Sequence, residues 1–164
     1  MLPVLLAVGA VALIASRTSK SMATSSSASR ADLERLVRAA ASTAGVDYAT
    51  LAAIVEIESR WRPDARNETG TDAARGGAYG LTQMTLRTAQ ALRPGTSREY
   101  LLTPEGNLDV AAQLMRDNAR RSRDPKDLAA MWNSGKVFDK APEVTRETYV
   151  PRFLSARAKY MGAA

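Results

Sequence analysis

The sequence predicts a mainly α-helical domain, because apolar residues recur at intervals of three and four from Arg30 onward. Strict alternation of apolar and polar residues does not extend over any useful length, so no long β-strand is expected. Residues 62–80 are rich in Gly, Asp, Asn and Thr, and they are expected to form a long loop or a small β-hairpin. A chain of 164 residues is long enough for one such domain.

The chain begins with an apolar segment. Residues 2–15, LPVLLAVGAVALIA, carry no charge, so residues 1–16 are predicted to be directed to a membrane. No basic residue precedes this segment, whereas Arg17 and Lys20 follow it, which favours a retained transmembrane helix formed by residues 2–16. A cleaved signal peptide is the alternative, since a helix of this length spans about 21 Å, short of the ~30 Å hydrocarbon core.

The next segment, residues 17–29, is rich in Ser and has no aromatic or branched aliphatic residue. Such a composition buries too little apolar surface to order itself, so it is predicted to be a tether. The expected organisation is therefore a membrane anchor or signal segment in residues 1–16, a tether in residues 17–29 and a folded domain in residues 30–164.

Six helices are expected in the folded domain. Ser29 and Gly45 are typical start and stop residues for the first, and Asp124-Pro125 is a strong start signal for the fifth. Pro151 fits the last helix only near its first turn or at a kink. The predicted helices span residues 32–43, 47–60, 85–92, 107–121, 124–132 and 143–160.

Composition limits the chemistry available to the chain. Cysteine and histidine are both absent, which excludes disulfides, thiolate nucleophiles, His-based triads and the usual zinc sites. With 23 basic and 17 acidic residues, the net charge of +6 suits an acidic polymer. Nucleic acid is a poor candidate, because the cations are scattered and aromatic residues make up only 5% of the chain.

One acidic residue is placed unusually. On a helical wheel, Leu51, Ile54 and Val55 define the buried stripe of the second helix, and Glu58 lies within it. Glu56 points away from that stripe and is most simply a solvated surface residue. A carboxyl at an apolar boundary loses hydration, which raises its pKa as a general acid requires. A structural Glu that is hydrogen-bonded or paired with an Arg is the alternative.

Two further segments suggest a binding groove. The glycines of residues 76–80 suit a tight turn that would deliver Gln83 into a groove. Trp132 follows the apolar stripe of the fifth helix, where it either packs in the core or forms a stacking platform for a sugar. Neither segment is specific by itself.

Taken in order, these segments resemble the soluble lytic transglycosylase family, lysozyme-like enzymes that cleave bacterial peptidoglycan. The resemblance covers about residues 51–160 and implies a goose-type lysozyme-like helical fold. Its motifs are Glu58-Ser59 at a helix end, GLTQM at residues 80–84, Trp132-Asn133 and Thr148-Tyr149-Val150.

The resemblance also implies roles for individual residues. The Glu of the Glu-Ser pair is the sole catalytic acid and base in the family, which assigns this role to Glu58. Thr82 stands where the family usually has Met, and Met131-Trp132 replace Ala-Tyr, so we expect altered subsites with the same reaction. The residues expected to bind the substrate are Ser59, Tyr79, Gln83, Met84, Trp132, Asn133 and Tyr149.

The reaction that the resemblance implies needs one carboxyl and no metal or cofactor. Glu58 would protonate the oxygen between N-acetylmuramic acid and N-acetylglucosamine, and would then take a proton from the C6 hydroxyl as a 1,6-anhydro ring closes. A muramidase-type hydrolase and a non-catalytic wall-binding assembly protein are the alternatives.

The small size and the N-terminal segments suit a local wall-opening enzyme that acts in the periplasm or at the cell wall. We expect peptidoglycan strands and a membrane, through residues 2–16, as partners, together with proteins of a larger machine. A bacteriophage virion, with the enzyme in an internal membrane or ejection apparatus, is favoured over a secretion or conjugation apparatus.

Overall fold

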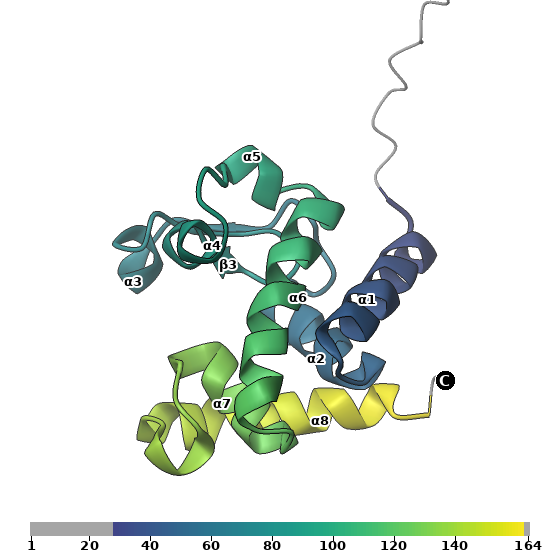
Figure 1. Ribbon diagram of the computed structural model, residues 1–164, viewed down its shortest axis with the longest axis vertical. Helices are drawn as coiled ribbons and strands as arrows, with labels where there is room; N and C mark the ends of the chain where they lie inside the picture. The colour runs from purple at the N-terminus through teal and green to yellow at the C-terminus, as the bar shows by residue number, and fades with distance from the viewer. Residues whose placement is uncertain (1–27, 163–164) are drawn as a thin grey trace, which may run out of the picture.

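The computed structural model describes residues 28–162, which are mostly helical (Figure 1). This confirms the predicted mainly α-helical class. The helices are α1 (Arg30–Ala44), α2 (Tyr48–Ser59), α3 (Gly70–Ala73), α4 (Leu86–Leu92), α5 (Arg98–Leu101), α6 (Pro104–Arg121), α7 (Pro125–Ser134), the 3-10 helix η1 (Phe138–Lys140), the π-helix η2 (Thr145–Tyr149) and α8 (Val150–Tyr160).

The helix boundaries follow local capping chemistry. Ser29 forms a capping box with Asp32 at the start of α1, and Gly45 ends this helix with a left-handed φ of 72°. Asp124 caps α7 by accepting a hydrogen bond from the backbone N–H of Lys126. These termini confirm the signals in the sequence, because caps act within a few residues of each helix end.

Two helices differ most from their predicted bounds. α6 begins at Pro104, three residues before the predicted start, because Thr103 is its cap and accepts a 3.1 Å hydrogen bond from the N–H of Gly106. The predicted last helix is divided into η2 and α8. Pro151 lies in the first turn of α8, where its missing N–H costs no intrahelical bond, so the predicted position of this proline is confirmed.

A small antiparallel sheet in the order β1-β2-β3 occupies part of the predicted loop region. Its strands have two residues each: β1 (Arg66–Asn67), β2 (Ala78–Tyr79) and β3 (Met84–Thr85). Arg66 lies opposite Tyr79, and Ala78 lies opposite Thr85. The hairpin expected within residues 62–80 therefore extends by a third strand to Thr85, and α3 lies between its first two strands.

The buried residues form two clusters. The larger cluster lies among α1, α2, α6, α7 and α8, and the smaller lies under the sheet, α4, α5 and the first half of α6. Figure 1 shows α6 running between these parts, with α3 to α5 near one end and α7 near the other. Trp132 packs against both clusters, so it lies where the two parts of the molecule meet.

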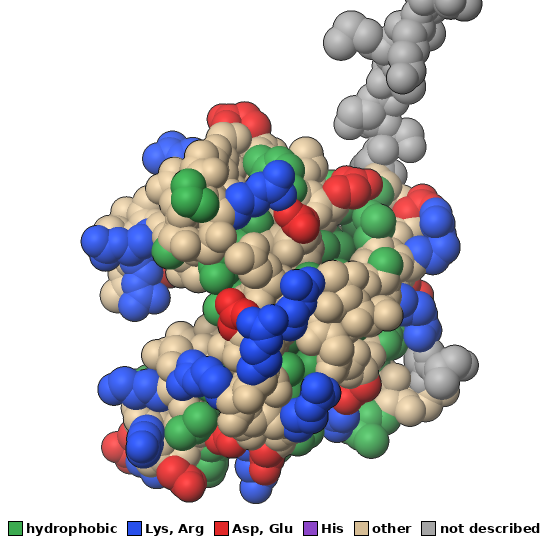
Figure 2. All heavy atoms as spheres, viewed as in Figure 1, with side chains coloured by type: hydrophobic (Ala, Val, Ile, Leu, Met, Phe, Trp, Pro, Cys, Tyr) green, Lys and Arg blue, Asp and Glu red, His purple; other side chains and the backbone are tan. Residues whose placement is uncertain are grey.

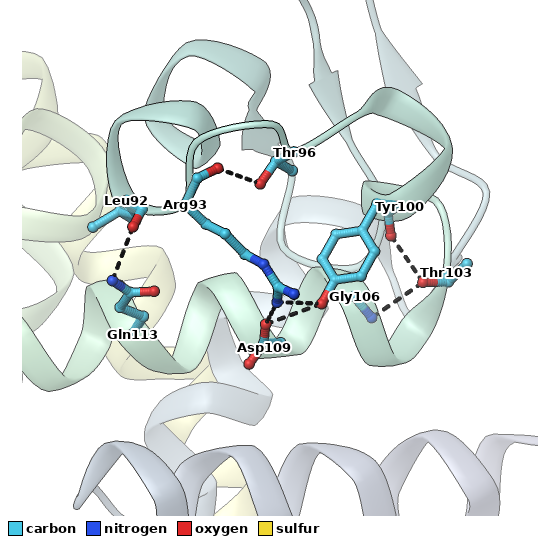
Figure 3. Close-up of polar contacts among 8 residues, drawn as sticks. All are labelled: Leu92, Arg93, Thr96, Tyr100, Thr103, Gly106, Asp109 and Gln113. Carbon is cyan, nitrogen blue, oxygen red and sulfur yellow. Dashed lines mark hydrogen bonds and ion pairs between the residues drawn. The ribbon is translucent and has the colours of Figure 1, made fainter.

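Polar contacts hold the smaller cluster on α6 (Figure 3). Arg93 pairs with Asp109, and the hydroxyl of Tyr100 donates a 3.0 Å hydrogen bond to the same carboxylate. The amide of Gln113 donates to the carbonyl of Leu92 at 3.1 Å. These contacts fix α4 and α5 against one face of α6.

Residues 28–162 contain no helix that is both long and apolar enough to span a bilayer. The predicted membrane segment, residues 2–16, and nearly all of the predicted tether lie outside the described residues.

Candidate active site

A cleft of about 810 Å³ lies between the two parts of the molecule. Figure 2 shows the hollow at one side, between the region of α3 and α4 and the region of α7. Its walls combine residues from the end of α2, the sheet region, α4, α6, the end of α7 and the segment that leads into η2. The lining residues are Glu58, Asn67, Thr71, Asp72, Arg75, Gln83, Met84, Thr85, Thr88, Leu114, Trp132, Asn133, Ser134, Lys136, Pro142, Val144 and Thr145.

Glu58 reaches the cleft from the last turn of α2. The helix begins at Asp47, whose carboxylate accepts a 2.7 Å hydrogen bond from the N–H of Thr50. The stripe predicted for this helix, Leu51, Ile54 and Val55, is buried in the larger cluster, which confirms the orientation read from the sequence. Oε1 of Glu58 accepts a 2.6 Å hydrogen bond from the hydroxyl of Tyr149.

The surroundings of Glu58 favour its protonated form. Burial raises the pKa of Glu58 to about 7, against the opposing effects of the Tyr149 hydrogen bond and the positive charge of Arg152. The negative charge of Asp72 raises the pKa of Glu58 further, and the indole of Trp132 lowers it. The carboxyl is therefore close to half protonated at neutral pH, as a group that must both donate and accept a proton requires.

Tyr149 is a hydrogen-bond donor at this site. Burial, followed by the negative charge of Glu58, raises the pKa of Tyr149 well above its ordinary value, so the hydroxyl keeps its proton. Tyr149 does not line the cleft, although Trp132 and Thr145 near it in the fold do; it is the last residue of η2, directly before α8.

The wall formed by the sheet region carries Gln83 and Met84. Gln83 has a φ of 47°, and its Nε2 donates hydrogen bonds to the carbonyls of Ala65, at 3.2 Å, and Gly80, at 3.0 Å. The side chain is thus held at the cleft wall by the turn that precedes it. Met84 is buried in the smaller cluster and also lines the cleft.

The opposite wall comes from the end of α7. Trp132 and Asn133 both line the cleft, and Trp132 also packs against both core clusters. Oδ1 of Asn133 accepts a 2.7 Å hydrogen bond from the hydroxyl of Thr145. Thr145 is buried in η2, and its position in the cleft was not predicted.

The family model described as "Transglycosylase SLT domain" matches residues 35–148 of this chain. The chain belongs to the transglycosylase SLT family. The predicted resemblance is thereby confirmed, and the chain is a lytic transglycosylase that acts on peptidoglycan. No curated protein and no solved structure matches the chain.

Besides Tyr149, two residues expected to bind substrate do not line the cleft of this transglycosylase. Ser59 is 1% exposed, and its Oγ donates a 3.2 Å hydrogen bond to the carbonyl of Val55. Tyr79 is also 1% exposed and packs in the smaller cluster, with its hydroxyl donating to Glu68 at 2.5 Å. The structure gives both side chains internal partners and brings neither to the cleft.

Thr82, which departs from the family pattern, has a structural partner in the transglycosylase. Its N–H and its hydroxyl both donate to Oδ1 of Asn107, at 2.9 and 2.8 Å, and the amide nitrogen of Asn107 donates to the carbonyls of Tyr79 and Leu101. Gly80 must be a glycine, because its φ is 73° and a Cβ there would overlap the carbonyl oxygen of Leu101. The departure thus changes a buried hydrogen-bond network and not a surface of the cleft.

The expected solvation of Glu56 is wrong. Its Oε2 accepts hydrogen bonds from Nε1 of Trp61 and from the hydroxyl of Tyr160, both at 2.9 Å. The chain reverses after α2 through left-handed residues, Arg60 with a φ of 53° and Trp61 with a φ of 64°, and this turn returns the indole to Glu56. Glu56 does not line the cleft.

Among the acidic residues of the segment from residue 62 to residue 80, Asp72 lines the cleft with Glu58, whereas Asp64 and Glu68 do not. Oδ2 of Asp72 accepts a 2.7 Å hydrogen bond from the amide of Asn67. Residues 28–162 contain no group of three or more acidic side chains arranged to hold a metal ion.

Proposed function

We propose that Glu58 is the single acid and base with which this transglycosylase cleaves the β-1,4 bond from N-acetylmuramic acid to N-acetylglucosamine. One observation carries the proposal: the carboxyl whose pKa burial raises to about 7 lies at the wall of the large cleft. Half-protonation near neutral pH suits a group that changes roles within one catalytic cycle.

The chemistry balances with one carboxyl. Glu58 donates its proton to the glycosidic oxygen as the bond from this oxygen to C1 of the muramyl sugar breaks. The resulting carboxylate then removes the proton of the C6 hydroxyl while O6 bonds to C1, which gives 1,6-anhydro-N-acetylmuramic acid and restores the acid. The Tyr149 hydroxyl stabilises the carboxylate between the two steps through its 2.6 Å hydrogen bond.

The two walls of the cleft supply groups suited to a sugar chain. Gln83, Met84, Trp132 and Asn133 line it, and they are the members of the predicted substrate-binding set that the structure brings together. Trp132 offers an aromatic surface for a sugar ring, and Gln83 and Asn133 offer amides for sugar hydroxyl and acetamido groups.

Hydrolysis is a second candidate because Asp72 lines the same cleft and its charge acts on Glu58. In an inverting glycosidase a second carboxylate activates a water on the far side of the sugar. Asp72 would be that carboxylate here, and the product would then carry a reducing end in place of an anhydro ring.

Mass spectrometry of the products from purified murein separates the two reactions. Anhydro-muramyl ends support the transglycosylase reaction, and reducing ends support hydrolysis. Glu58→Gln must abolish the release of either product, because both reactions need this carboxyl. Continued turnover by this variant would contradict the role of Glu58.

We also propose that residues 2–16 anchor the enzyme in a membrane and that residues 17–29 let the domain reach the wall. The apolar first segment, the two cations behind it and the Ser-rich stretch support this arrangement. A bacteriophage virion is the favoured setting, and a secretion or conjugation apparatus is the second.

Antibody detection in purified phage particles supports the virion. Detection only in host envelopes contradicts it. Intact N-terminal peptides in mass spectra of the membrane fraction support the retained anchor, whereas a mature chain that lacks these peptides and begins within or after the apolar segment supports cleavage.

A further inference from the structure

Two basic residues lie on opposite walls of the cleft. Arg75 follows α3 on the wall of the sheet region, and Lys136 follows α7 on the other wall. Both residues are exposed. Figure 2 shows Lys and Arg side chains on both lips of the hollow. Basic charge therefore borders the cleft from two sides.

Neither cation has an acidic partner within the described part of the chain. The six ion pairs among residues 28–162 involve other arginines, and neither the guanidinium of Arg75 nor the ammonium of Lys136 forms a hydrogen bond with another residue of this range. The two acidic residues of the cleft already have other partners, since Glu58 accepts from Tyr149 and Asp72 accepts from Asn67. Both cations are thus available to an anionic ligand.

The backbone at both basic residues is fixed by local structure, although their side chains are exposed. The N–H of Arg75 donates to the carbonyl of Asp72 at 2.9 Å, and the carbonyl of Arg75 accepts from the N–H of Arg87 at 3.0 Å. Lys136 follows Gly135, which ends α7 with a φ of 74°. A fixed backbone reduces the conformational entropy that is lost when such side chains bind a ligand.

We propose that Arg75 and Lys136 bind carboxylates of the peptide stems, so that strands with ionised stems are the preferred substrate. The inference rests on the proposed function, since it places a glycan strand in this cleft. When a stem is attached to the lactyl group through an amide, the sugars of the strand carry no charge. The stem carboxylates are then the anions nearest the strand, and a cation on each wall can meet stems that leave the strand on either side.

Selective neutralisation of the substrate tests the proposal. Stem carboxylates of solubilised peptidoglycan strands are converted to methylamides with carbodiimide and methylamine, which leaves the sugars unchanged. We expect kcat/KM of the wild type to fall about tenfold on the amidated strands, because each exposed ion pair contributes roughly two- to fivefold. The double variant Arg75→Gln/Lys136→Gln should cleave both substrates at about the lower rate.

A matched double variant controls for overall charge. Arg121 and Lys140 are exposed, have no ion pair among the described residues and do not line the cleft. Arg121→Gln/Lys140→Gln removes the same two charges and should discriminate between the substrates as the wild type does. Equal loss of discrimination in both double variants would assign the effect to general attraction and overturn the proposal. A wild type that cleaves both substrates equally well would also overturn it.

Binding measurements keep this inference separate from the proposed catalytic role. Glu58→Gln is mixed with native and with amidated insoluble murein, and the bound fraction is measured with and without the Arg75 and Lys136 substitutions. Charge-dependent binding that disappears only with these substitutions supports the inference even if Glu58→Gln proves active. Equal bound fractions on native and on amidated murein contradict the inference even if Glu58→Gln is inactive.

Discussion

Glu56 and Glu58 of α2 each have a tyrosine and a tryptophan as neighbours, but the rest of their surroundings differ. Glu58 accepts a hydrogen bond from the hydroxyl of Tyr149, and the indole of Trp132 lowers the pKa of Glu58. Glu56 accepts from the hydroxyl of Tyr160 and the indole of Trp61. A tyrosine and a tryptophan next to a glutamate therefore do not define the active site of this transglycosylase.

The two residues differ in what their side chains face. Glu58 lies at the wall of the cleft with Asp72 nearby, and burial raises its pKa to about 7. Glu56 instead joins the end of α2 to the end of α8 through its hydrogen bond from Tyr160. There the guanidinium carbon of Arg30 also lies over the ring of Trp61, 3.7 Å from its centre. One carboxylate is placed to meet a substrate, and the other holds helices together.

The largest expected effect comes from exchanging each carboxylate for its amide. Glu58→Gln should lower kcat on purified murein by at least about 1000-fold, because general acid–base catalysis contributes roughly 100- to 10,000-fold and both steps use this group. Glu56→Gln should keep wild-type activity, since an amide oxygen can still accept from Trp61 and Tyr160. Release of soluble muropeptides measures both rates. Similar losses in the two variants would remove the distinction between them.

The second effect is on stability. The pKa of Glu58 is about 7 in the folded chain and near its ordinary value of 4.5 after unfolding. Below pH 4.5 the group is protonated in both states, and above pH 7 it is ionised in both, so the wild type loses stability as the pH rises between these values. Linkage sets this loss at about 3 kcal/mol. Glu58→Gln should not show this loss of stability, because its amide does not ionise.

Urea unfolding of the wild type, Glu58→Gln and Glu56→Gln from pH 4 to pH 8 measures this difference. The gap in unfolding free energy between Glu58→Gln and the wild type should widen with rising pH. Glu56→Gln retains Glu58 and should follow the wild-type trend. A gap that stays constant across the pH range would show that burial does not penalise the Glu58 charge.

The sequence predicts those features of the fold and the site that depend on residues close together in the chain. Caps such as Asp47 and Asp124 and the stripe of α2 act within one or two helical turns, so they predict the helices and the orientation of Glu58 correctly. The strands have only two residues each and produce no alternating pattern. Their pairing depends on contacts between residues distant in the sequence.

The same reasoning explains the errors at the site. Ser59 belongs to the Glu58-Ser59 motif, and Tyr79 directly precedes the GLTQM motif. Packing decides which side chains near a motif face the cleft, and these two side chains are buried. The solvation predicted for Glu56 is wrong because a left-handed turn at Arg60 and Trp61 is not apparent from helical periodicity. Arg75 reaches the cleft from a loop whose position depends on the whole fold.

The third effect compares the two tyrosines. Tyr149→Phe removes the donor to Glu58 and should lower kcat about tenfold or more, since a hydrogen bond to a charged group contributes about 1.5–3 kcal/mol. The Tyr149 hydrogen bond lowers the pKa of Glu58, so its loss should raise this pKa. The descending alkaline limb of the kcat profile, which reports loss of the Glu58 proton, should move to higher pH.

Tyr160→Phe is the matched substitution on the other side of α2. It removes the donor to Glu56 and should reduce the unfolding free energy by about 1 kcal/mol without moving the pH profile. A shift of the profile in Tyr160→Phe equal to that in Tyr149→Phe would show that the effect does not pass through the contact with Glu58.

The smallest effect concerns Asp72, whose negative charge acts on Glu58. The negative charge of Asp72 raises the pKa of Glu58, so Asp72→Asn should lower this pKa and move the alkaline limb to lower pH. Asp64→Asn is the control, because Asp64 is exposed and does not line the cleft. Activity of Asp72→Asn below the shifted limb should stay close to that of the wild type if the C6 hydroxyl closes the anhydro ring. Complete loss of activity across the pH range would instead make Asp72 a catalytic base and favour hydrolysis.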